Sequence, residues 1–384
     1  MTTRSRIAII GGGPGGLMLA RLLQLRGVRA TVFERDADAD ERPQGGSLDL
    51  HAETGQRAMR LAGLEAEFAA AARPEDQGDR LYDQHGALLF DRDGTGDDRP
   101  EIDRTALRRI LLDSLAPDIV RWAHKVEAVI PRAAGGYDVV VDGRHLSFDI
   151  VVGADGAWSK VRALLTDATP IYEGVTLVEL GFDAGRHPHV DALVGGGKMF
   201  AVGDNRLLIA QRNGHGHIRV YAGLRMPEAT ASEWTTAGAD VVTAALREAF
   251  AGWAPSLTYL FEQGDFIAVR PLHALPVGHH WPSRPGLTLL GDAAHLMSPF
   301  GGEGVNLALS DAAELAEALS GGGGWQAVSR YEAAMIERAA PAAEGAAQGV
   351  ATAVSSDGVA TVLDHYLERV ELGAADMADY GRSS

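Results

Sequence analysis

A run of glycines near the N-terminus has the spacing of a turn that binds a dinucleotide. Gly11, Gly13 and Gly16 follow a short apolar segment and precede a helical pattern. In such turns the first glycine makes the bend, the second lets the backbone approach a pyrophosphate, and the third packs helix against strand. The helix N-terminus offers N–H groups and partial positive charge to the phosphates. A structural turn without a ligand is the alternative, and the surrounding pattern favours the nucleotide.

Glu34 narrows the choice of nucleotide, because it ends the next apolar segment, 18 residues after Gly16. A carboxylate there can accept a hydrogen bond from a ribose 2′-hydroxyl and would repel a 2′-phosphate. FAD or NAD therefore fits this site, and NADP does not. Pro14 suits the first turn of the helix, where its missing N–H costs nothing.

Two later apolar segments also end in an acidic turn. Asp155 and Gly156 follow one of them, and Gly291 and Asp292 follow the other. A strand-to-helix connection without chemistry is the alternative for the first turn. After the second turn, the glycine-rich stretch 299–306 opens a helix, whose N-terminus would stabilise negative charge on N1 and O2 of a reduced flavin.

The composition excludes several classes of function. The chain has 384 residues, with 35 Lys plus Arg and 52 Asp plus Glu, which give a formal net charge of −17. Such a chain repels phosphate backbones and anionic lipid, so we expect no nucleic-acid partner and no membrane partner. The lack of cysteine excludes disulfides, thiolate metal sites and a cysteine nucleophile, and makes a cytoplasmic location the default. The 13 histidines offer no convergent set of three ligands, so no metal site is expected.

These motifs need strands and helices to position them. Hydrophobic periodicity indicates strands at 6–10 and 31–33, helices at 17–25, 51–72, 104–115 and 301–319, strands between 120 and 152, and a separate sheet from 175–224. Four glycines at 321–324 lead to an alanine-rich helical tail, which we expect Pro341 to interrupt. Residues 7–20 are interrupted by glycines and are shorter than the roughly 20 apolar residues of a membrane span.

The glycine turn, the Asp155-Gly156 turn and the Gly291-Asp292 motif together resemble, in order and spacing, those of the class A FAD-dependent aromatic hydroxylases and related monooxygenases. The resemblance covers nearly the whole chain. Within this family the chain is similar to the tetracycline-inactivating monooxygenases in three strings, at residues 45–51, 101–104 and 292–297.

The resemblance implies a set of cofactor contacts. It places FAD contacts at Gly11, Gly13, Pro14, Gly15, Gly16, Glu34, Arg35, Asp49, Arg104, Asp155, Asp292, Pro299, Gly301, Gly302, Gly304, Val305 and Asn306. It also implies an NADPH contact at Arg42 and places Pro299 beside the reactive edge of the flavin. No protein nucleophile or obligatory base is implied. Solvated surface arginines are the alternative for Arg42 and Arg104.

The sequence differs from the tetracycline-type pattern at two positions that contact the substrate in those enzymes. Those enzymes hold the drug with a glutamine and an arginine, and the matching positions here are Glu179 and Lys198. A carboxylate in place of the amide would disfavour an anionic substrate group, and lysine lacks the planar fork of arginine. The alternative is that both side chains are exposed or pair with each other.

The implied fold is α/β, with a Rossmann-type FAD-binding domain that is discontinuous in sequence, a β-sheet substrate domain and a C-terminal helix. The expected ranges are 1–72, 100–170 and 265–320 for the FAD-binding domain, 73–99 and 171–264 for the substrate-binding domain, and 321–384 for the C-terminal helical segment.

The implied activity is that of an FAD-dependent monooxygenase. It would consume NADPH or NADH as a transient co-substrate and place one atom of O2 on a polycyclic aromatic or phenolic small molecule, through a flavin C4a-hydroperoxide. A tetracycline-like antibiotic or a natural-product intermediate is the expected substrate, and a monomer the expected state. An FAD-dependent reductase of the same fold and a non-catalytic flavin-binding protein are the alternatives.

Overall fold

The computed structural model describes residues 5–41, 45–94 and 98–368 and divides the chain into two compact units. Unit 1 consists of Met1–Arg73, Asp98–Ile171 and His273–Ala347, and unit 2 of Pro74–Asp97, Tyr172–Leu272 and Gln348–Ser384. The expected functional domain ranges stay a prediction from the sequence, because compactness alone does not assign a function to a segment.

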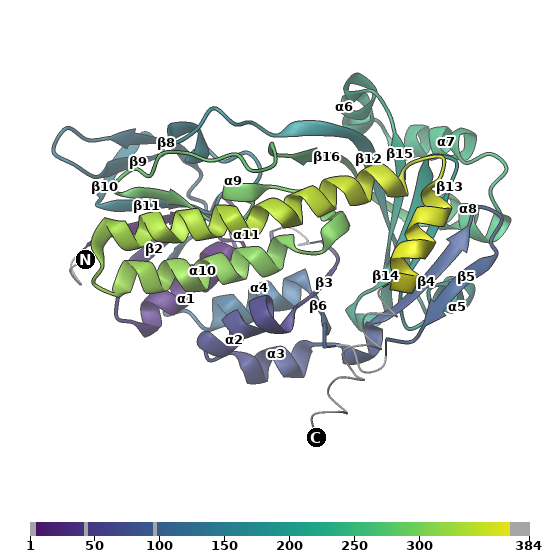
Figure 1. Ribbon diagram of the computed structural model, residues 1–384, viewed down its shortest axis with the longest axis horizontal. Helices are drawn as coiled ribbons and strands as arrows, with labels where there is room; N and C mark the ends of the chain where they lie inside the picture. Colours follow the sequence, from purple (N-terminus) through teal and green to yellow (C-terminus); the bar gives the residue numbers. More distant parts are fainter. Residues whose placement is uncertain (1–4, 42–44, 95–97, 369–384) are drawn as a thin grey trace. The chain divides into compact units, whose positions relative to one another are not determined.

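Unit 1 is built on a parallel sheet of five strands (Figure 1). The strands in spatial order are β17 (Leu287–Leu289), β11 (Ile150–Gly153), β1 (Ile7–Ile10), β2 (Ala30–Phe33) and β7 (Val120–Arg121). All residues of β1 and β11 are buried, as expected for parallel strands that are covered on both faces. This arrangement confirms the Rossmann-type fold predicted from the sequence.

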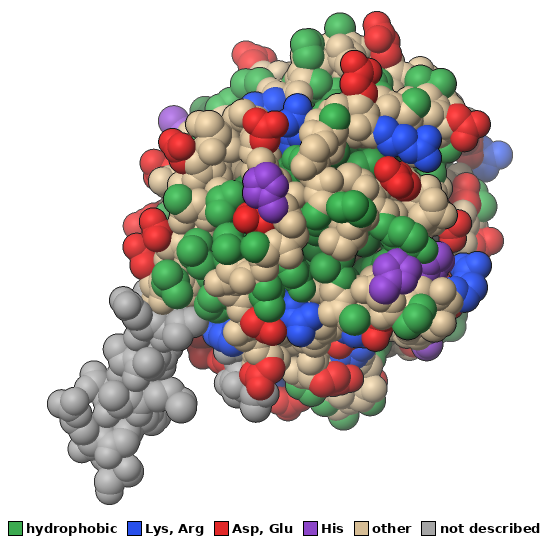
Figure 2. Space-filling view, turned by 90° about the vertical axis from the view of Figure 1, so that its right-hand side faces the viewer, with side chains coloured by type: hydrophobic (Ala, Val, Ile, Leu, Met, Phe, Trp, Pro, Cys, Tyr) green, Lys and Arg blue, Asp and Glu red, His purple; other side chains and the backbone are tan. Residues whose placement is uncertain are grey.

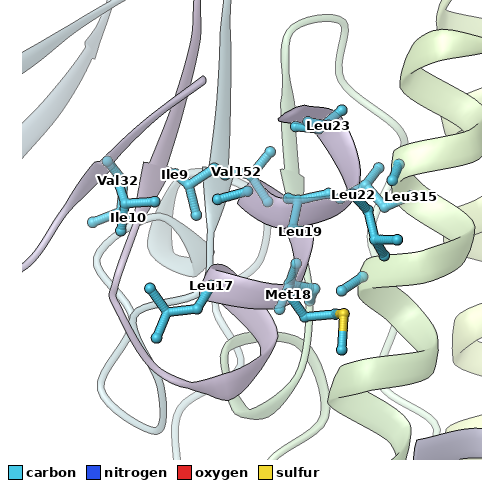
Figure 3. Packing of buried hydrophobic residues seen from close by; sticks show 14 of the residues in the cluster. Ile9, Ile10, Leu17, Met18, Leu19, Leu22, Leu23, Val32, Val152 and Leu315 are labelled. Atoms are coloured by element: carbon cyan, nitrogen blue, oxygen red, sulfur yellow. The ribbon is translucent and has the colours of Figure 1, made fainter. Parts of the chain in front are cut away.

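Helices α1 (Pro14–Leu25) and α10 (Gly304–Ser320) pack against each other beside this sheet. Figure 3 shows Leu19 and Leu22 of α1 near Leu315 of α10, with Ile9 of β1 and Val152 of β11 in the same apolar cluster. The apolar positions that predicted this helix are therefore the ones that α1 buries in the core.

Smaller elements complete unit 1. They are β3 (Ser47–Asp49), η1 (Ala52–Gln56), α2 (Arg57–Leu61), α3 (Glu65–Ala71), β6 (Glu101–Asp103), α4 (Arg104–Asp113), β8 (Val126–Pro131), β9 (Tyr137–Val141), β10 (Arg144–Phe148), η3 (Arg162–Leu164), α9 (Asp292–His295) and η5 (Pro299–Gly301). Strands β8, β9 and β10 form an antiparallel sheet, and β3 pairs with β6.

Unit 2 is built on a seven-stranded sheet. Its strands in spatial order are β16 (Asp265–Ala274), β12 (Ile171–Asp183), β15 (His217–Arg225), β14 (Arg206–Arg212), β13 (Gly197–Gly203), β4 (Gly78–Asp83) and β5 (Leu88–Arg92). One face packs on apolar residues of α5 (Pro188–Val194), α7 (Ala239–Ala249) and α8 (Pro255–Glu262). The short elements η2 (Pro74–Asp76), η4 (Gly214–Gly216) and α6 (Glu228–Thr236) also belong to this unit. On the molecular face drawn in Figure 2, acidic and basic side chains are interspersed.

The separate sheet expected from 175–224 is confirmed, although the segment also contains α5. Two other expectations about elements were wrong. The helix expected at 51–72 is broken between α2 and α3, because Gly63 has a φ of +66° and ends α2. The tail is not interrupted, because α11 (Gly324–Ala353) continues through Pro341. Ala339 and Ala346 pack into the same apolar cluster on either side of this proline and hold the helix.

Candidate functional site

The glycine turn between β1 and α1 is shaped by close backbone contacts. Gly11 has a φ of +111°, and a Cβ atom on it would lie 2.2 Å from the carbonyl oxygen of Ala154. A Cβ on Gly16 would lie 2.2 Å from the carbonyl oxygen of Gly11. Gly13, in contrast, has no atom within 4 Å of its Cβ position. The first and third glycines are thus required by the fold, whereas the second leaves open space beside the backbone.

Helix α1 begins at Pro14, directly after this open space. Its N-cap residue is Gly13, which has no side chain to accept hydrogen bonds from the first turn. The N–H groups of Gly15 and Gly16, at the second and third positions of the helix, lack carbonyl partners in a preceding turn. These groups suit the oxygens of a pyrophosphate.

Glu34, at the end of β2, is buried and faces the same turn. Its carboxylate accepts hydrogen bonds from the backbone N–H groups of Gly12, at 2.7 Å, and Asp36, at 3.0 Å. A carboxylate has about four lone-pair positions, so capacity for a ribose hydroxyl remains. The adjacent Arg35 is 63% exposed and lies 3.9 Å from Asp36.

Arg108 supports the turn from α4, a role that the sequence analysis missed. Its guanidinium is buried, donates to the carbonyl oxygen of Gly12 at 3.2 Å and lies 3.4 Å from Asp36. An arginine among the polar positions of an amphipathic helix carries no signal that distinguishes it from a surface residue.

Asp155 closes the turn that follows β11. It accepts hydrogen bonds from the hydroxyl of Ser159, at 2.5 Å, and the N–H of Lys160, at 2.8 Å. Burial raises the pKa of this carboxyl group, and those hydrogen bonds oppose the rise. These bonds give Asp155 a structural role, and its contact with a cofactor stays a prediction.

A second group of predicted residues meets where β3 approaches the start of α10. The amide of Asn306 donates to the carbonyl oxygen of Asp49 at 2.9 Å, and its oxygen accepts from the N–H of His51 at 2.9 Å. A Cβ on Gly302 would lie 3.4 Å from the Asp49 carboxylate. Gly55, in η1, allows equally close approach, because its Cβ would lie 2.5 Å from the Asn306 oxygen. The structure therefore brings together Asp49, Gly302 and Asn306.

His51 completes this group, although the sequence analysis assigned it no role. Its imidazole lies 3.3 Å from the Asp49 carboxylate and 3.5 Å from that of Glu303. Burial by itself would lower the pKa of His51, but hydrogen bonds to the two carboxylates and their charge outweigh it and raise the pKa to about 9. The imidazole is therefore protonated at neutral pH.

The remaining predicted residues of unit 1 lie on exposed loops or helix ends. Asp292, Pro299, Gly301 and Arg104 are exposed. Gly304 and Val305 begin α10, and a Cβ atom on Gly304 would lie 4.0 Å from Asp292. The side chain of Arg104 packs against Gly45. Arg42 lies outside the described residues.

A buried network of charged side chains, centred on Asp311, holds the backbone of the Gly291-Asp292 turn. The carboxylate of Asp311 accepts from the N–H of Gly291 at 3.0 Å, contacts Nε2 of His295 at 2.6 Å and pairs with Arg338 at 2.9 Å. Burial by itself would raise the pKa of Asp311, but His295 and Arg338 outweigh it and lower the pKa. The charge of Asp311 likewise raises the pKa of His295 against the effect of burial.

Glu179 and Lys198 belong to unit 2 and do not pair with each other. Glu179 is 2% exposed and pairs with Arg219 and Arg270, whereas Lys198 lies 3.7 Å from Asp79. The alternative, that both are exposed or mutually paired, is therefore wrong. The reason is the strand order, because β15 and β14 separate β12 from β13.

The described residues contain no group of three or more His, Asp or Glu side chains arranged to hold a metal ion. Within the same part of the chain, no helix has the length and apolar character needed to cross a membrane.

The glycine turn, the buried Glu34 and the start of α10 together fit a flavin dinucleotide, and comparisons with known proteins point the same way. Residues 4–200 and 277–347 match the family model of the FAD binding domain. The chain is 34% identical over 370 residues to Monooxygenase asqM of Emericella nidulans, covering 82% of this chain and 83% of that protein. It is 35% identical over 371 residues to Monooxygenase penA of Penicillium thymicola, covering 83% and 85%.

Solved structures share the fold at lower identity. HpxO of Klebsiella pneumoniae, complexed with FAD and uric acid, matches with a TM-score of 0.79 and 22% identity, over 97% of this chain and 96% of that one. Tetracycline destructase Tet(55) matches with a TM-score of 0.76 and 20% identity, over the same shares. From the family match and these relatives, the chain belongs to the FAD binding domain family and is an FAD-dependent monooxygenase.

Proposed function

We propose that this monooxygenase takes electrons from NADPH or NADH and places one atom of O2 on a polycyclic aromatic or phenolic small molecule. The observation that carries the proposal is that several of the residues predicted to hold FAD form two groups in unit 1, one at the glycine turn with Glu34 and one of Asp49, Gly302 and Asn306 at the start of α10. The monooxygenase relatives at 34% and 35% identity support the reaction class.

The glycine turn would hold the phosphates of FAD. The open space at Gly13 and the unpartnered N–H groups at the start of α1 would face the pyrophosphate, and Glu34 would accept from the ribose. Arg108 would keep the turn in place through the carbonyl oxygen of Gly12.

The second group would hold the flavin ring. Asn306 fixes Asp49 and the Gly302 loop to the first turn of α10, so backbone N–H groups at that helix end can face the ring. Bound FAD would supply hydride acceptance and oxygen activation, while the chain orients the ring and stabilises negative charge on it. His51 lies in the same group, where its positive charge pairs with the carboxylates of Asp49 and Glu303 and would offset part of their repulsion of a negatively charged ring. Pro299 would border the reactive edge.

Substrate would lie against unit 2 side chains that include Glu179 and Lys198. The chain carries a single nucleotide fingerprint, so the nicotinamide donor would bind transiently.

The test is oxidation of NADPH and of NADH by FAD-loaded protein, with tetracycline and a panel of polycyclic phenols, under ¹⁸O₂. We expect stimulated oxidation and a product heavier by one labelled oxygen atom. Saturated product without label would indicate a reductase, and failure to bind FAD would indicate that the cofactor proposal is wrong. Label on tetracycline would identify a drug-inactivating enzyme, whereas label on other phenols alone would place the substrate among those polycycles.

A further inference from the structure

Two arginines hold the carboxylate of Glu179 from two neighbouring strands. Nη1 of Arg219, on β15, donates to Oε1 at 3.0 Å. Nε and Nη2 of Arg270, on β16, reach Oε2 at 2.9 and 2.8 Å. Glu179 itself is in the middle of β12 and is buried. The three side chains together carry one net positive charge, since arginine is always protonated.

One arginine would balance the charge of the buried Glu179 carboxylate, and this carboxylate has two. The side chains of Arg219 and Arg270 are 19% and 55% exposed, so each is partly accessible to solvent. A guanidinium has five N–H donors, and the bonds to Glu179 use one from Arg219 and two from Arg270. Donors in a planar, pre-oriented arrangement therefore remain for another acceptor.

The sheet face around these arginines differs from the opposite face. Tyr221, Ile209 and Gln211 lie on the same face and are half-buried, by their register with Glu179 and Arg219. Their neighbours on the opposite face are fully buried under helices. A half-buried surface of aromatic, aliphatic and amide side chains beside a cationic pair suits a flat organic ring with one acidic group.

Lys198 lies in the same row as Arg219. The register runs from Lys198 to Gln211 to Arg219 across β13, β14 and β15. With strands about 4.8 Å apart, two steps separate their backbones by about 10 Å, the span of a fused-ring molecule.

We propose that Arg219 and Arg270, positioned by Glu179, form an anion-binding site that receives a carboxylate or an ionised enol of the substrate. The inference rests on the proposed function and specifies its substrate class. It also reverses the expectation that a carboxylate at position 179 disfavours an anionic group, because two cations compensate that carboxylate. Glu179 orients both guanidinium groups and reduces their combined charge from two to one, which keeps the bound anion exchangeable.

A matched pair of ligands tests the site: 1-hydroxy-2-naphthoate and 1-hydroxy-2-naphthamide, which differ in charge but hardly in shape. Binding to FAD-loaded protein is measured by calorimetry. We expect the naphthoate to bind at least about ten-fold more tightly, the equivalent of about 1.4 kcal/mol. Equal affinities, or no naphthoate binding at concentrations up to about 1 mM, the weak end of specific binding, would overturn the proposal.

Variants assign the preference to these side chains. Arg270→Gln changes a half-exposed residue, so it should fold, and it should reduce the naphthoate preference at least five-fold, as should Arg219→Gln. Glu179→Gln should tighten naphthoate binding, because the site then carries two positive charges. Arg206→Gln is the matched control, since Arg206 lies on the same sheet but pairs with Asp204. A preference that survives both Arg219→Gln and Arg270→Gln would refute the assignment.

The two proposals can fail separately. If the protein binds FAD and oxidises NADPH but shows no naphthoate preference, only the anion site is wrong. If the protein binds no FAD, the proposed function is wrong, and the same calorimetry on the FAD-free protein still decides the anion site.

Discussion

The two large sheets of this protein position polar groups in opposite ways. Around the parallel sheet of unit 1, the candidate site consists mainly of backbone, in the glycine turn and at the start of α10, and buried side chains such as Arg108 and Asn306 hold that backbone in place. On the seven-stranded sheet of unit 2, the polar groups are side chains paired across strands, as Glu179 pairs with Arg219 and Arg270. Backbone geometry tolerates few substitutions, whereas side chains on a sheet face can be exchanged. This difference suits a constant cofactor and a variable substrate.

Substitution of one buried carboxylate in each unit, Asp311 and Glu179, tests this difference directly. Asp311→Asn should lower the free energy of unfolding by about 3 kcal/mol, because it leaves His295 and Arg338 without the carboxylate in a buried network. Glu179→Gln should cost less, since Arg270 is 55% exposed and can be solvated. Denaturant titration of the two variants and of the parent provides the measurement. Equal losses would contradict the comparison.

Substitutions in the glycine turn should distinguish an effect on stability from an effect on FAD binding. Gly13→Ala should leave the free energy of unfolding nearly unchanged, because its φ is −79° and its Cβ position is open. If the pyrophosphate occupies that space, FAD affinity should fall at least about ten-fold, or about 1.4 kcal/mol. Gly11→Ala is the contrasting variant, because it should reduce both stability and FAD content. Unchanged FAD affinity in Gly13→Ala, measured by fluorescence titration, would place the phosphates elsewhere.

His51 should make the stability of unit 1 depend on pH. Its pKa is raised from 6.5 to about 9 by Asp49 and Glu303, so its contribution is complete below about pH 6.5 and is lost as the pH rises through about 9. The contribution should be no more than about 3 kcal/mol, since the rise from 6.5 to about 9 sets the limit and each unit of pKa corresponds to about 1.36 kcal/mol. The free energy of unfolding should differ more between pH 6.5 and pH 9.5 in the parent than in His51→Gln. The same pH dependence in both proteins would contradict the assignment.

The smallest effect is expected on the surface of unit 2. Arg206→Gln should change the free energy of unfolding by less than about 0.5 kcal/mol, because its pairing with Asp204 is exposed to solvent. Thermal unfolding of the variant beside the parent checks this. A larger loss would mean that ion pairs on this sheet carry more of the stability than the comparison allows.

The sequence was most informative where a residue type is required by backbone geometry. Gly11 and Gly16 could be identified from spacing alone, because each has a Cβ position blocked by a carbonyl oxygen. Arg108, His51 and Arg219 could not, since their roles depend on partners far away in the chain. The alternative that Glu179 and Lys198 pair with each other could not be excluded from the sequence for the same reason, because strand order is not encoded in the local pattern.

The sequence by itself determined the α/β class, the parallel strand run and the flavin-dependent family, because glycine spacing and apolar periodicity act over a few residues and survive in any context. Only the tertiary structure decided the charge of the candidate substrate face. Glu179 is a negative residue in the sequence, but Arg219 and Arg270 make its surroundings positive. The physical reason is that electrostatic sign depends on distances in space, and those are set by strand pairing between segments that lie 40 and 91 positions away along the chain.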